Sequence, residues 1–132
     1  MEETLMQAAR AARERAYCVY SHFAVGAALL TEDGTVFTGC NVENAAYGEC
    51  ICAERTAVVK AVSEGHRKIR AVAICGAPEG HAPDAPCMPC GACRQVLAEF
   101  GGEALRVILT DGVHTLGELL PGRFQLGNDA DM

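Results

Sequence analysis

Two short segments that contain cysteine constrain the fold of this chain more than any other feature. The first reads Cys52-Ala53-Glu54, and the second reads Pro89-Cys90-Gly91-Ala92-Cys93. Each stands where a loop ends and a helical pattern begins, and the Cys90-x-x-Cys93 spacing lets two thiolates hold one ion from the first turn of a helix. If Cys52 supplies a third thiolate, the fold must bring two distant helix starts to one point.

The metal that this arrangement predicts is zinc, with one Zn²⁺ per chain. Three thiolates leave one position of a tetrahedral zinc open for water, and a bound zinc lowers the pKa of that water to about 7. Glu54 lies two residues after Cys52, close enough to reach the water without binding the metal. We therefore predict that Cys52, Cys90 and Cys93 are zinc ligands and that Glu54 is a catalytic acid–base group.

Two other uses of the cysteines remain open at the level of sequence. Cys87 and Cys90 also have the C-x-x-C spacing, which is typical of redox dithiols. A structural zinc with four cysteine ligands is the second alternative, with Cys87 or Cys50 in the fourth position. Neither alternative requires a glutamate beside Cys52, so Glu54 favours the catalytic interpretation.

Composition and charge limit the kinds of molecule that this chain is expected to bind. A chain of 132 residues has the size of one domain, and its net charge of −6 comes from 11 basic and 17 acidic residues. No basic run marks a nucleic-acid surface, and no apolar run is long enough to span a membrane. We expect a small-molecule substrate and neither a nucleic-acid nor a membrane partner.

The positions of the cysteines and the first three residues indicate the cellular compartment in which the protein is expected. Most of the eight cysteines lie inside or beside helix and strand patterns, which is unlike a disulfide-stapled secreted domain. Met1-Glu2-Glu3 is acidic where a secretory signal would be basic. We therefore expect a reducing compartment and a cytoplasmic protein.

The apolar periodicity alternates between helical and strand spacing. It predicts helices over 5–17, 52–64 and 90–100, strands over 25–30, 35–38, 69–75, 105–109 and 113–114, and a short last helix after Thr115. Thr4 to Gln7 is a candidate capping box for the first helix, and Glu32-Asp33-Gly34 indicates a hairpin turn. The order predicts an α/β fold, a three-layer α-β-α sandwich with a five-stranded mixed sheet. We expect residues 1–132 to form a single domain, with 127–132 as a mobile tail.

Taken together, the motifs resemble those of the small, homotetrameric zinc-dependent cytidine deaminases. The resemblance extends in order through Tyr20–Phe23, Val25–Leu30, Gly39–Ala45, Cys52–Ala57, Lys60–Gly65, Pro89–Leu97 and Glu118–Pro121. It implies a cytidine-deaminase-like fold and a hydrolase that converts cytidine and 2′-deoxycytidine to uridine and 2′-deoxyuridine in pyrimidine salvage, with release of ammonia. A zinc-bound hydroxide would attack C4 of the base while Glu54 shuttles protons.

A substrate site is expected on the loop before Cys52. Asn41 and Glu43 offer an amide and a carboxylate that suit ribose hydroxyls, and the charge of Glu43 would repel a phosphate. The resemblance implies that this pair binds the 3′-hydroxyl. It also implies that Phe23 packs on the pyrimidine and that the backbone N–H of Ala53 donates to the base carbonyl.

The resemblance implies further roles outside the pocket of one chain. Arg55 is expected to hydrogen-bond a ligand sulfur, which would offset the negative charge of three thiolates. Ala45, Tyr47 and Phe124 are similar to positions that reach a neighbouring subunit's site in a homotetramer with shared active sites.

Three departures from the family pattern, at Val19, in the loop over 76–88 and at Gln125-Leu126, accompany the resemblance, and three rival interpretations remain. The loop over 76–88 is longer than is common in the family, and we expect it to bring Cys87 and His81 near the metal. The rivals are a blasticidin-type deaminase, a nucleic-acid deaminase and a zinc-stabilised interaction module. The Asn-x-Glu-Asn sequence at 41–44 argues against the first, the cysteine at position 52 and the acidic charge against the second, and the presence of Glu54 against the third.

Overall fold

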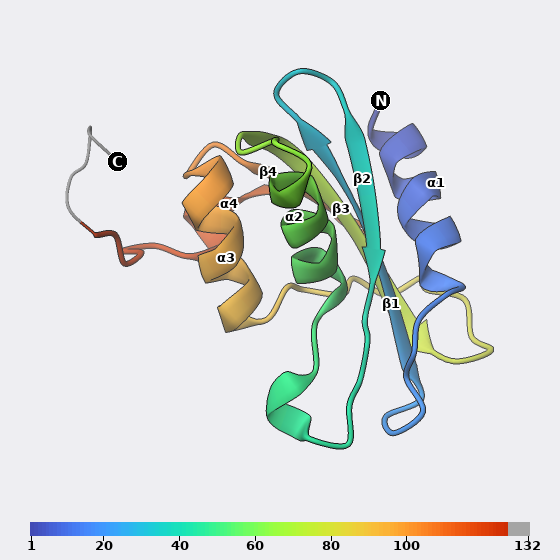
Figure 1. Ribbon diagram of the computed structural model, residues 1–132. Helices are drawn as coiled ribbons and strands as arrows, with labels where there is room; N and C mark the ends of the chain where they lie inside the picture. Colours follow the sequence, from blue (N-terminus) through green and yellow to red (C-terminus); the bar gives the residue numbers. More distant parts are fainter. Residues whose placement is uncertain (127–132) are drawn as a thin grey trace.

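The computed structural model describes residues 1–126 (Figure 1). Its elements, in chain order, are α1 (Glu2–Arg13), β1 (Phe23–Thr31), β2 (Val36–Cys40), the short 3₁₀ helix η1 (Tyr47–Glu49), α2 (Ala53–Ser63), β3 (Ile69–Pro78), α3 (Gly91–Gly101), β4 (Arg106–Leu109), β5 (Gly112–Thr115) and α4 (Leu116–Leu119). The tail predicted over 127–132 lies outside the described residues. Within 1–126, no helix combines the length and the apolar character needed to cross a membrane.

The strands form one five-stranded mixed sheet in the order β2-β1-β3-β4-β5. β3 and β4 are parallel, joined through α3, whereas the other neighbouring pairs are antiparallel. α1 covers one face of the sheet, and α2 and α3 cover the other (Figure 1). The predicted three-layer α-β-α architecture is confirmed.

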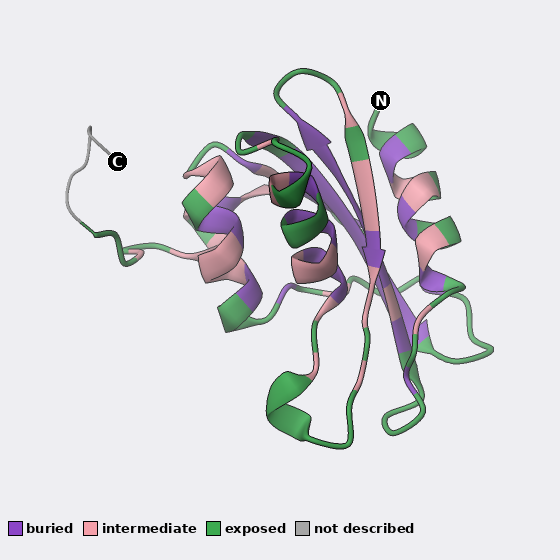
Figure 2. Cartoon of the chain, viewed as in Figure 1, coloured by how far each residue is buried: buried purple, intermediate pink, exposed green. Residues whose placement is uncertain are grey.

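Each face of the sheet has its own core, because alternate residues of a strand point to opposite faces. Leu29 and Val72 face α2 and α3, while Ala28 and Ala73 face α1. β3 is buried on both faces over most of its length, which explains why its sequence reads as a nearly continuous apolar run (Figure 2). The helices are thus fixed against a rigid central sheet.

Close backbone approaches bring the helices onto the sheet. A Cβ built at Gly39 in β2 would lie 2.6 Å from the carbonyl oxygen of Ala53, and one built at Gly26 in β1 would lie 2.0 Å from that of Ala9. Only glycine leaves room for these contacts. The contact at Gly39 presses the first turn of α2 onto β2, which fixes the position of Cys52 just before the helix.

The first helix differs from its prediction at both ends. It begins at Glu2 with Met1 as N-cap, because Leu5 N–H already bonds the Met1 carbonyl at 3.0 Å and two glutamates favour the positive helix end. Thr4 therefore lies inside the helix and caps nothing. The helix ends at Arg13 because Tyr17 is drawn away to pair with the segment after β2, where its N–H bonds the Asn41 carbonyl at 2.9 Å.

β1 and β3 extend well beyond their predicted ends, and the last helix is as expected. β1 and β3 extend to Phe23 and Pro78, which pair with each other across the sheet. Thr115 and Glu118 form the predicted capping box of α4. The extension matters for the site, because it holds the backbone of Phe23 on a strand.

Candidate metal centre and substrate pocket

The three predicted ligand cysteines meet at one point. Cys52 is the N-cap of α2, Cys90 is the N-cap of α3, and Cys93 lies in the first turn of α3. Both helices begin at the same end of the molecule (Figure 1). The Cys52 and Cys90 sulfurs are 3.9 Å apart, those of Cys90 and Cys93 are 3.3 Å apart, and all three lie within 4.8 Å of one another.

These sulfur separations fit one zinc ion. Ligands at about 2.3 Å in a tetrahedron place sulfurs about 3.8 Å from one another. Three thiols at helix N-termini also face the positive ends of two helix dipoles, which favour their ionised form. Within residues 1–126, Cys87 is not a member of this sulfur group, so the three-ligand arrangement is the one that the geometry supports.

The thiols are electrostatically unequal. Hydrogen bonding with Cys93 and Cys90 and the nearby charge of Arg55 lower the pKa of Cys52 to about 6, although burial opposes the shift. The pKa of Cys93 is raised, chiefly because it donates to Cys52 and is buried. Of these two thiols, Cys52 is therefore the one that ionises first.

Glu54 is the buried carboxyl of this centre. It is the second residue of α2 and only 4% exposed. Burial raises the pKa of Glu54 to about 7, and the charge of Cys52 adds to the rise. A carboxyl that titrates near neutral pH can both take up and release a proton there.

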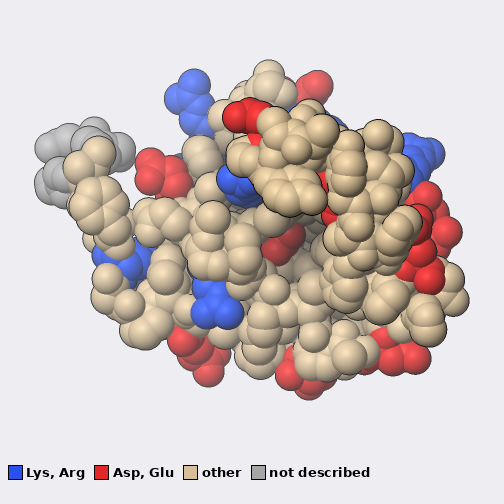
Figure 3. All heavy atoms as spheres, turned by 90° about the horizontal axis from the view of Figure 1, so that it is seen from below, with Lys and Arg blue, Asp and Glu red and all other residues tan. Residues whose placement is uncertain are grey.

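A cavity of about 350 Å³ opens over the centre. A hollow is visible at this end of the molecule, seen in Figure 3 from below. The cavity is the size of a small-molecule site. The predicted site residues in its wall are Phe23, Asn41, Glu43, Cys52, Ala53, Glu54 and Cys90.

The polar pair in the cavity wall is held by the chain itself. Asn41 accepts from the N–H of Val25 at 2.9 Å and donates to the carbonyl of Phe23 at 2.8 Å. Glu43 Oε1 accepts from the N–H groups of Tyr20 at 2.9 Å and Ser21 at 3.1 Å, and Oε2 accepts from the Ser21 hydroxyl. These bonds, first among them that from the Ser21 hydroxyl, lower the pKa of Glu43.

The two arginines beside the centre bind backbone carbonyls. Arg55 donates to the carbonyl of Cys50 at 2.9 Å, and within residues 1–126 its buried Nε has no hydrogen-bond partner. The hydrogen bond predicted from Arg55 to a ligand sulfur is not found among these residues, and its charge acts on Cys52 instead. Arg94 bonds the carbonyls of Pro89 at 2.8 Å and Leu119 at 2.6 Å, which ties the start of α3 to α4.

Three predicted substrate-binding residues lie outside the wall of the cavity. Tyr47 is 76% exposed and packs edge-on against Tyr20, with the ring centroids 6.2 Å apart. Phe124 is 67% exposed on the C-terminal segment that leaves the body beside α3 (Figure 1). Ala45 lies on the exposed loop before η1. A single chain therefore does not bring these three residues to its own pocket.

Of the two residues that the long loop over 76–88 was expected to bring near the metal, only Cys87 lies at the pocket. Cys87 lies in the cavity wall with Met88, and burial raises the pKa of Cys87 to about 11, so it stays a thiol. His81 lies elsewhere, in a separate hollow with Arg13 and Glu79, so its expected place near the metal is wrong. Sequence reasoning missed Ser21 and Met88, although Ser21 stands two residues before Phe23, a spacing that often shares one face.

Comparisons with known proteins agree with this site. A family model described as "Cytidine and deoxycytidylate deaminase zinc-binding region" matches residues 1–109. A cytidine deaminase from Sporosarcina psychrophila is 50% identical over 127 residues, which cover 92% of this chain and 90% of that protein. The crystal structure of a cytidine deaminase from Burkholderia pseudomallei has a TM-score of 0.83 at 50% identity and covers 94% of this chain and 99% of that one.

A further solved structure gives the same result. The cytidine deaminase from Mycobacterium tuberculosis has a TM-score of 0.84 at 44% identity, and the match covers 94% of this chain and 97% of that one. These matches confirm the resemblance that the motifs indicated. The chain belongs to the cytidine deaminase family of zinc-dependent hydrolases.

Proposed function

We propose that this chain catalyses the hydrolytic deamination of cytidine and 2′-deoxycytidine to uridine and 2′-deoxyuridine, with release of ammonia. One observation supports the proposal most strongly. A single cavity of about 350 Å³ contains Cys52 and Cys90 of the sulfur group, the buried carboxyl of Glu54, and the Asn41–Glu43 pair. Groups suited to metal binding, proton transfer and sugar binding therefore face the same cavity.

In the proposed reaction, the zinc ion would activate water, and residues of the chain would hold the ion and transfer protons. Cys52, Cys90 and Cys93 would hold the ion, and zinc supplies a Lewis acid that activates water at neutral pH. Glu54 takes a proton from the attacking water and delivers it to N3 of the base. As the oxygen bonds to C4, Glu54 passes the second water proton to the exocyclic amine, the C4–N bond breaks, and ammonia leaves.

The base is oriented by the first turn of α2 and by β1. Ala53 is the first residue of α2, where backbone N–H groups have no partner inside the helix, and it lies in the cavity wall. This supports donation from its N–H to the base carbonyl. Phe23, also in the wall, offers an aromatic face to the pyrimidine.

The hydrogen-bond capacity of the polar pair matches one hydroxyl group. A carboxylate has about four acceptor sites, and three donors already occupy those of Glu43. The amide of Asn41 has two N–H groups, of which one is used. One acceptor site of Glu43 and one N–H of Asn41 remain, which suffices for the 3′-hydroxyl and supports turnover of both ribo- and 2′-deoxyribonucleosides.

The charge of Glu43 supports nucleosides rather than nucleotides. Its lowered pKa keeps it ionised, and an ionised carboxylate in the pocket repels a phosphate. We expect a much lower kcat/KM for cytidine 5′-monophosphate. Cytosine base lacks the sugar and should also be a poor substrate.

We also propose that the protein is a homotetramer with shared sites. The support is exposed apolar surface near the pocket, where Tyr20, Tyr47 and Ile51 are 48%, 76% and 40% exposed, together with the exposed ring of Phe124. Coexpression of Glu54→Gln with Phe124→Ala tests it. Mixed oligomers that are more active than either parent support sharing, and an activity equal to the average of the parents contradicts it.

The setting of the reaction is pyrimidine salvage in the cytoplasm. All eight cysteines lie within the described residues and are free thiols, which supports a reducing compartment.

An ultraviolet assay of cytidine loss, with zinc content measured on the same sample, tests the function. Cytidine, 2′-deoxycytidine, cytidine 5′-monophosphate, cytosine and blasticidin S should be compared. We expect rapid loss of the two nucleosides only. Zinc-loaded protein that leaves both intact would contradict the proposal, and preference for blasticidin S would support the rival deaminase.

A further inference from the structure

The Ser21 hydroxyl connects two parts of the pocket that the proposed function uses separately. It donates to Oε2 of Glu43, and it accepts from the backbone N–H of Phe23 at 3.0 Å. Ser21 also lies in the cavity wall. A single side chain therefore links the carboxylate to the residue that carries the aromatic ring.

The loop that carries Ser21 is held from its other side as well. His22 has a left-handed backbone with φ of 58°, and its N–H bonds the carbonyl of Cys18 at 2.8 Å. Its carbonyl accepts from the N–H of Glu79 at 2.8 Å, and its ring lies 3.1 Å from the Glu79 carboxylate. A non-glycine residue keeps this conformation only where its surroundings hold it, so the loop is a fixed support.

Ser21 is the donor that orients the carboxylate. The two backbone N–H groups both bond Oε1 of Glu43, which leaves the rotation of the carboxylate about that anchor undetermined. The terminal torsion of a glutamate is soft. Among residues 1–126, Oε2 accepts its hydrogen bond from the Ser21 hydroxyl, and one acceptor site of that oxygen is left for a ligand.

We infer that Ser21 is a positioning residue whose hydroxyl orients Glu43 toward a single sugar hydroxyl of the nucleoside. This inference rests on the proposed function. It assigns to Ser21 part of the selectivity for an intact 3′-hydroxyl. Its effect therefore depends on the substrate, whereas a merely structural role would affect all substrates alike.

The experiment pairs changes in the protein with changes in the substrate. The parent protein and Ser21→Ala are assayed on cytidine, 2′-deoxycytidine and 3′-deoxycytidine, with zinc per chain measured for each. We expect Ser21→Ala to lose about 10-fold in kcat/KM on the first two, mainly through KM, because one bond to a charged group is lost. On 3′-deoxycytidine the two proteins should be within about 2-fold, because the sugar contact is already absent.

Three further variants separate the hydroxyl from the packing. Ser21→Thr keeps the hydroxyl and should retain most of the parent's kcat/KM on cytidine. Ser21→Val has the shape of threonine but no hydroxyl, and it should show the same loss as Ser21→Ala. This pair also serves if Ser21→Ala is unstable, because the two side chains have the same shape. Ser63→Ala removes an exposed serine hydroxyl far from the pocket, at the end of α2, and should match the parent.

The outcomes separate this inference from the proposed function. If the parent leaves cytidine intact, the proposed function fails, and the role of Ser21 fails with it. If the parent deaminates cytidine but Ser21→Ala loses the same factor on 3′-deoxycytidine, or nothing on cytidine, only the role of Ser21 is overturned. Equal kcat/KM values for Ser21→Thr and Ser21→Val on cytidine would overturn it as well.

Discussion

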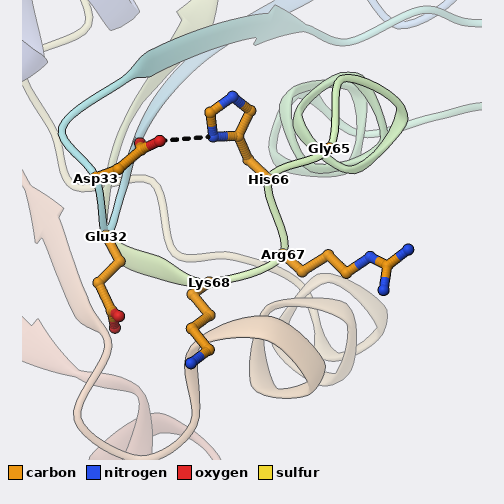
Figure 4. A pocket seen from close by; sticks show the side chains of 6 residues that line it. All are labelled: Glu32, Asp33, Gly65, His66, Arg67 and Lys68. Atoms are coloured by element: carbon orange, nitrogen blue, oxygen red, sulfur yellow. Dashed lines mark ion pairs between the residues drawn. The ribbon is translucent and has the colours of Figure 1, made fainter.

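Each end of the sheet has a hollow, and the larger of the two is not the one that contains the predicted catalytic group. The pocket at the start of α2 and α3 has about 350 Å³, whereas a hollow at the opposite end has about 470 Å³. The larger hollow is lined by Glu32, Asp33, Gly65, His66, Arg67 and Lys68 (Figure 4). Its charges are exposed, and Asp33 is paired with His66 at 3.3 Å.

The smaller pocket has the opposite electrostatic character. Burial raises the pKa of Glu54, whereas hydrogen bonds from Thr31 and Thr35 lower the pKa of Asp33. A carboxyl kept ionised by its partners stabilises the fold, and one kept from ionising by burial is available for proton transfer. The contrast indicates that burial and pairing, rather than the size of a hollow, decide whether a carboxyl is available for proton transfer.

The largest expected effect concerns proton transfer at the smaller pocket. Glu54→Gln should keep one zinc per chain and lower kcat by at least about 10²–10⁴-fold, because a general acid–base group is removed. Asp33→Asn is the matched control at the other end and should stay within about 2-fold. Cytidine turnover and zinc content measure both, and a Glu54→Gln variant with parental activity would remove Glu54 from the mechanism.

The second prediction concerns which sulfurs bind the metal. Cys90→Ser should lose zinc and activity, because it removes one of three ligands. Cys87→Ser, in the same cavity wall but outside the sulfur group, should retain one zinc per chain. Zinc analysis after dialysis decides between them, and loss of zinc from Cys87→Ser would make Cys87 a ligand.

The third prediction concerns the stability cost of the buried carboxyl. The pKa of Glu54 is raised from 4.5 to about 7 on folding, so the folded state binds more protons and stability falls as pH rises through this interval. In the zinc-free protein, Glu54→Gln should therefore be more stable than the parent at pH 8, by ~3 kcal/mol. The difference should shrink toward pH 4.5, as urea denaturation at each pH would show. An unchanged difference across this range would contradict a buried, protonated Glu54.

The smallest expected effect has the opposite sign and lies at the other end. The pKa of Asp33 is lowered by hydrogen bonds from Thr31 and Thr35, so its contribution to stability is present above its ordinary pKa of 3.8 and is lost as pH falls through the folded value. Asp33→Asn should lower Tm slightly at pH 7 and match the parent in strong acid. Thermal denaturation over pH measures it. A Tm difference that persists in acid would assign the effect to packing.

Local patterns in the sequence were sufficient to predict the centre of the site. Cys52, Cys90 and Cys93 could be placed together because each stands at a helix start, and helix starts are visible in periodicity. The five-stranded mixed sheet and the helices on both of its faces followed from the alternation of elements. Thr4 was misjudged because its capping-box pattern was given more weight than Glu2 and Glu3, which favour a helix start at Met1.

Contacts that depend on the fold were beyond prediction. Arg55 bonds the Cys50 carbonyl because of where the loop after β2 runs, and that path is set by pairing with Tyr17 and Ile51 rather than by local sequence. The bridge from Ser21 to Glu43 joins two loops far apart in the chain. His81 was expected near the metal, but its carbonyl accepts from Arg13, which holds it away.

Stepwise return of zinc to the metal-free protein tests the central claim most directly. Cytidine deamination should rise in proportion to bound zinc and stop rising at one ion per chain, because the three-cysteine group forms a single site in the pocket that contains Glu54. The same titration of Cys90→Ser should restore no activity. Full deaminase activity in the metal-free protein would contradict the account. Binding of one zinc ion per chain without any deaminase activity would also contradict it.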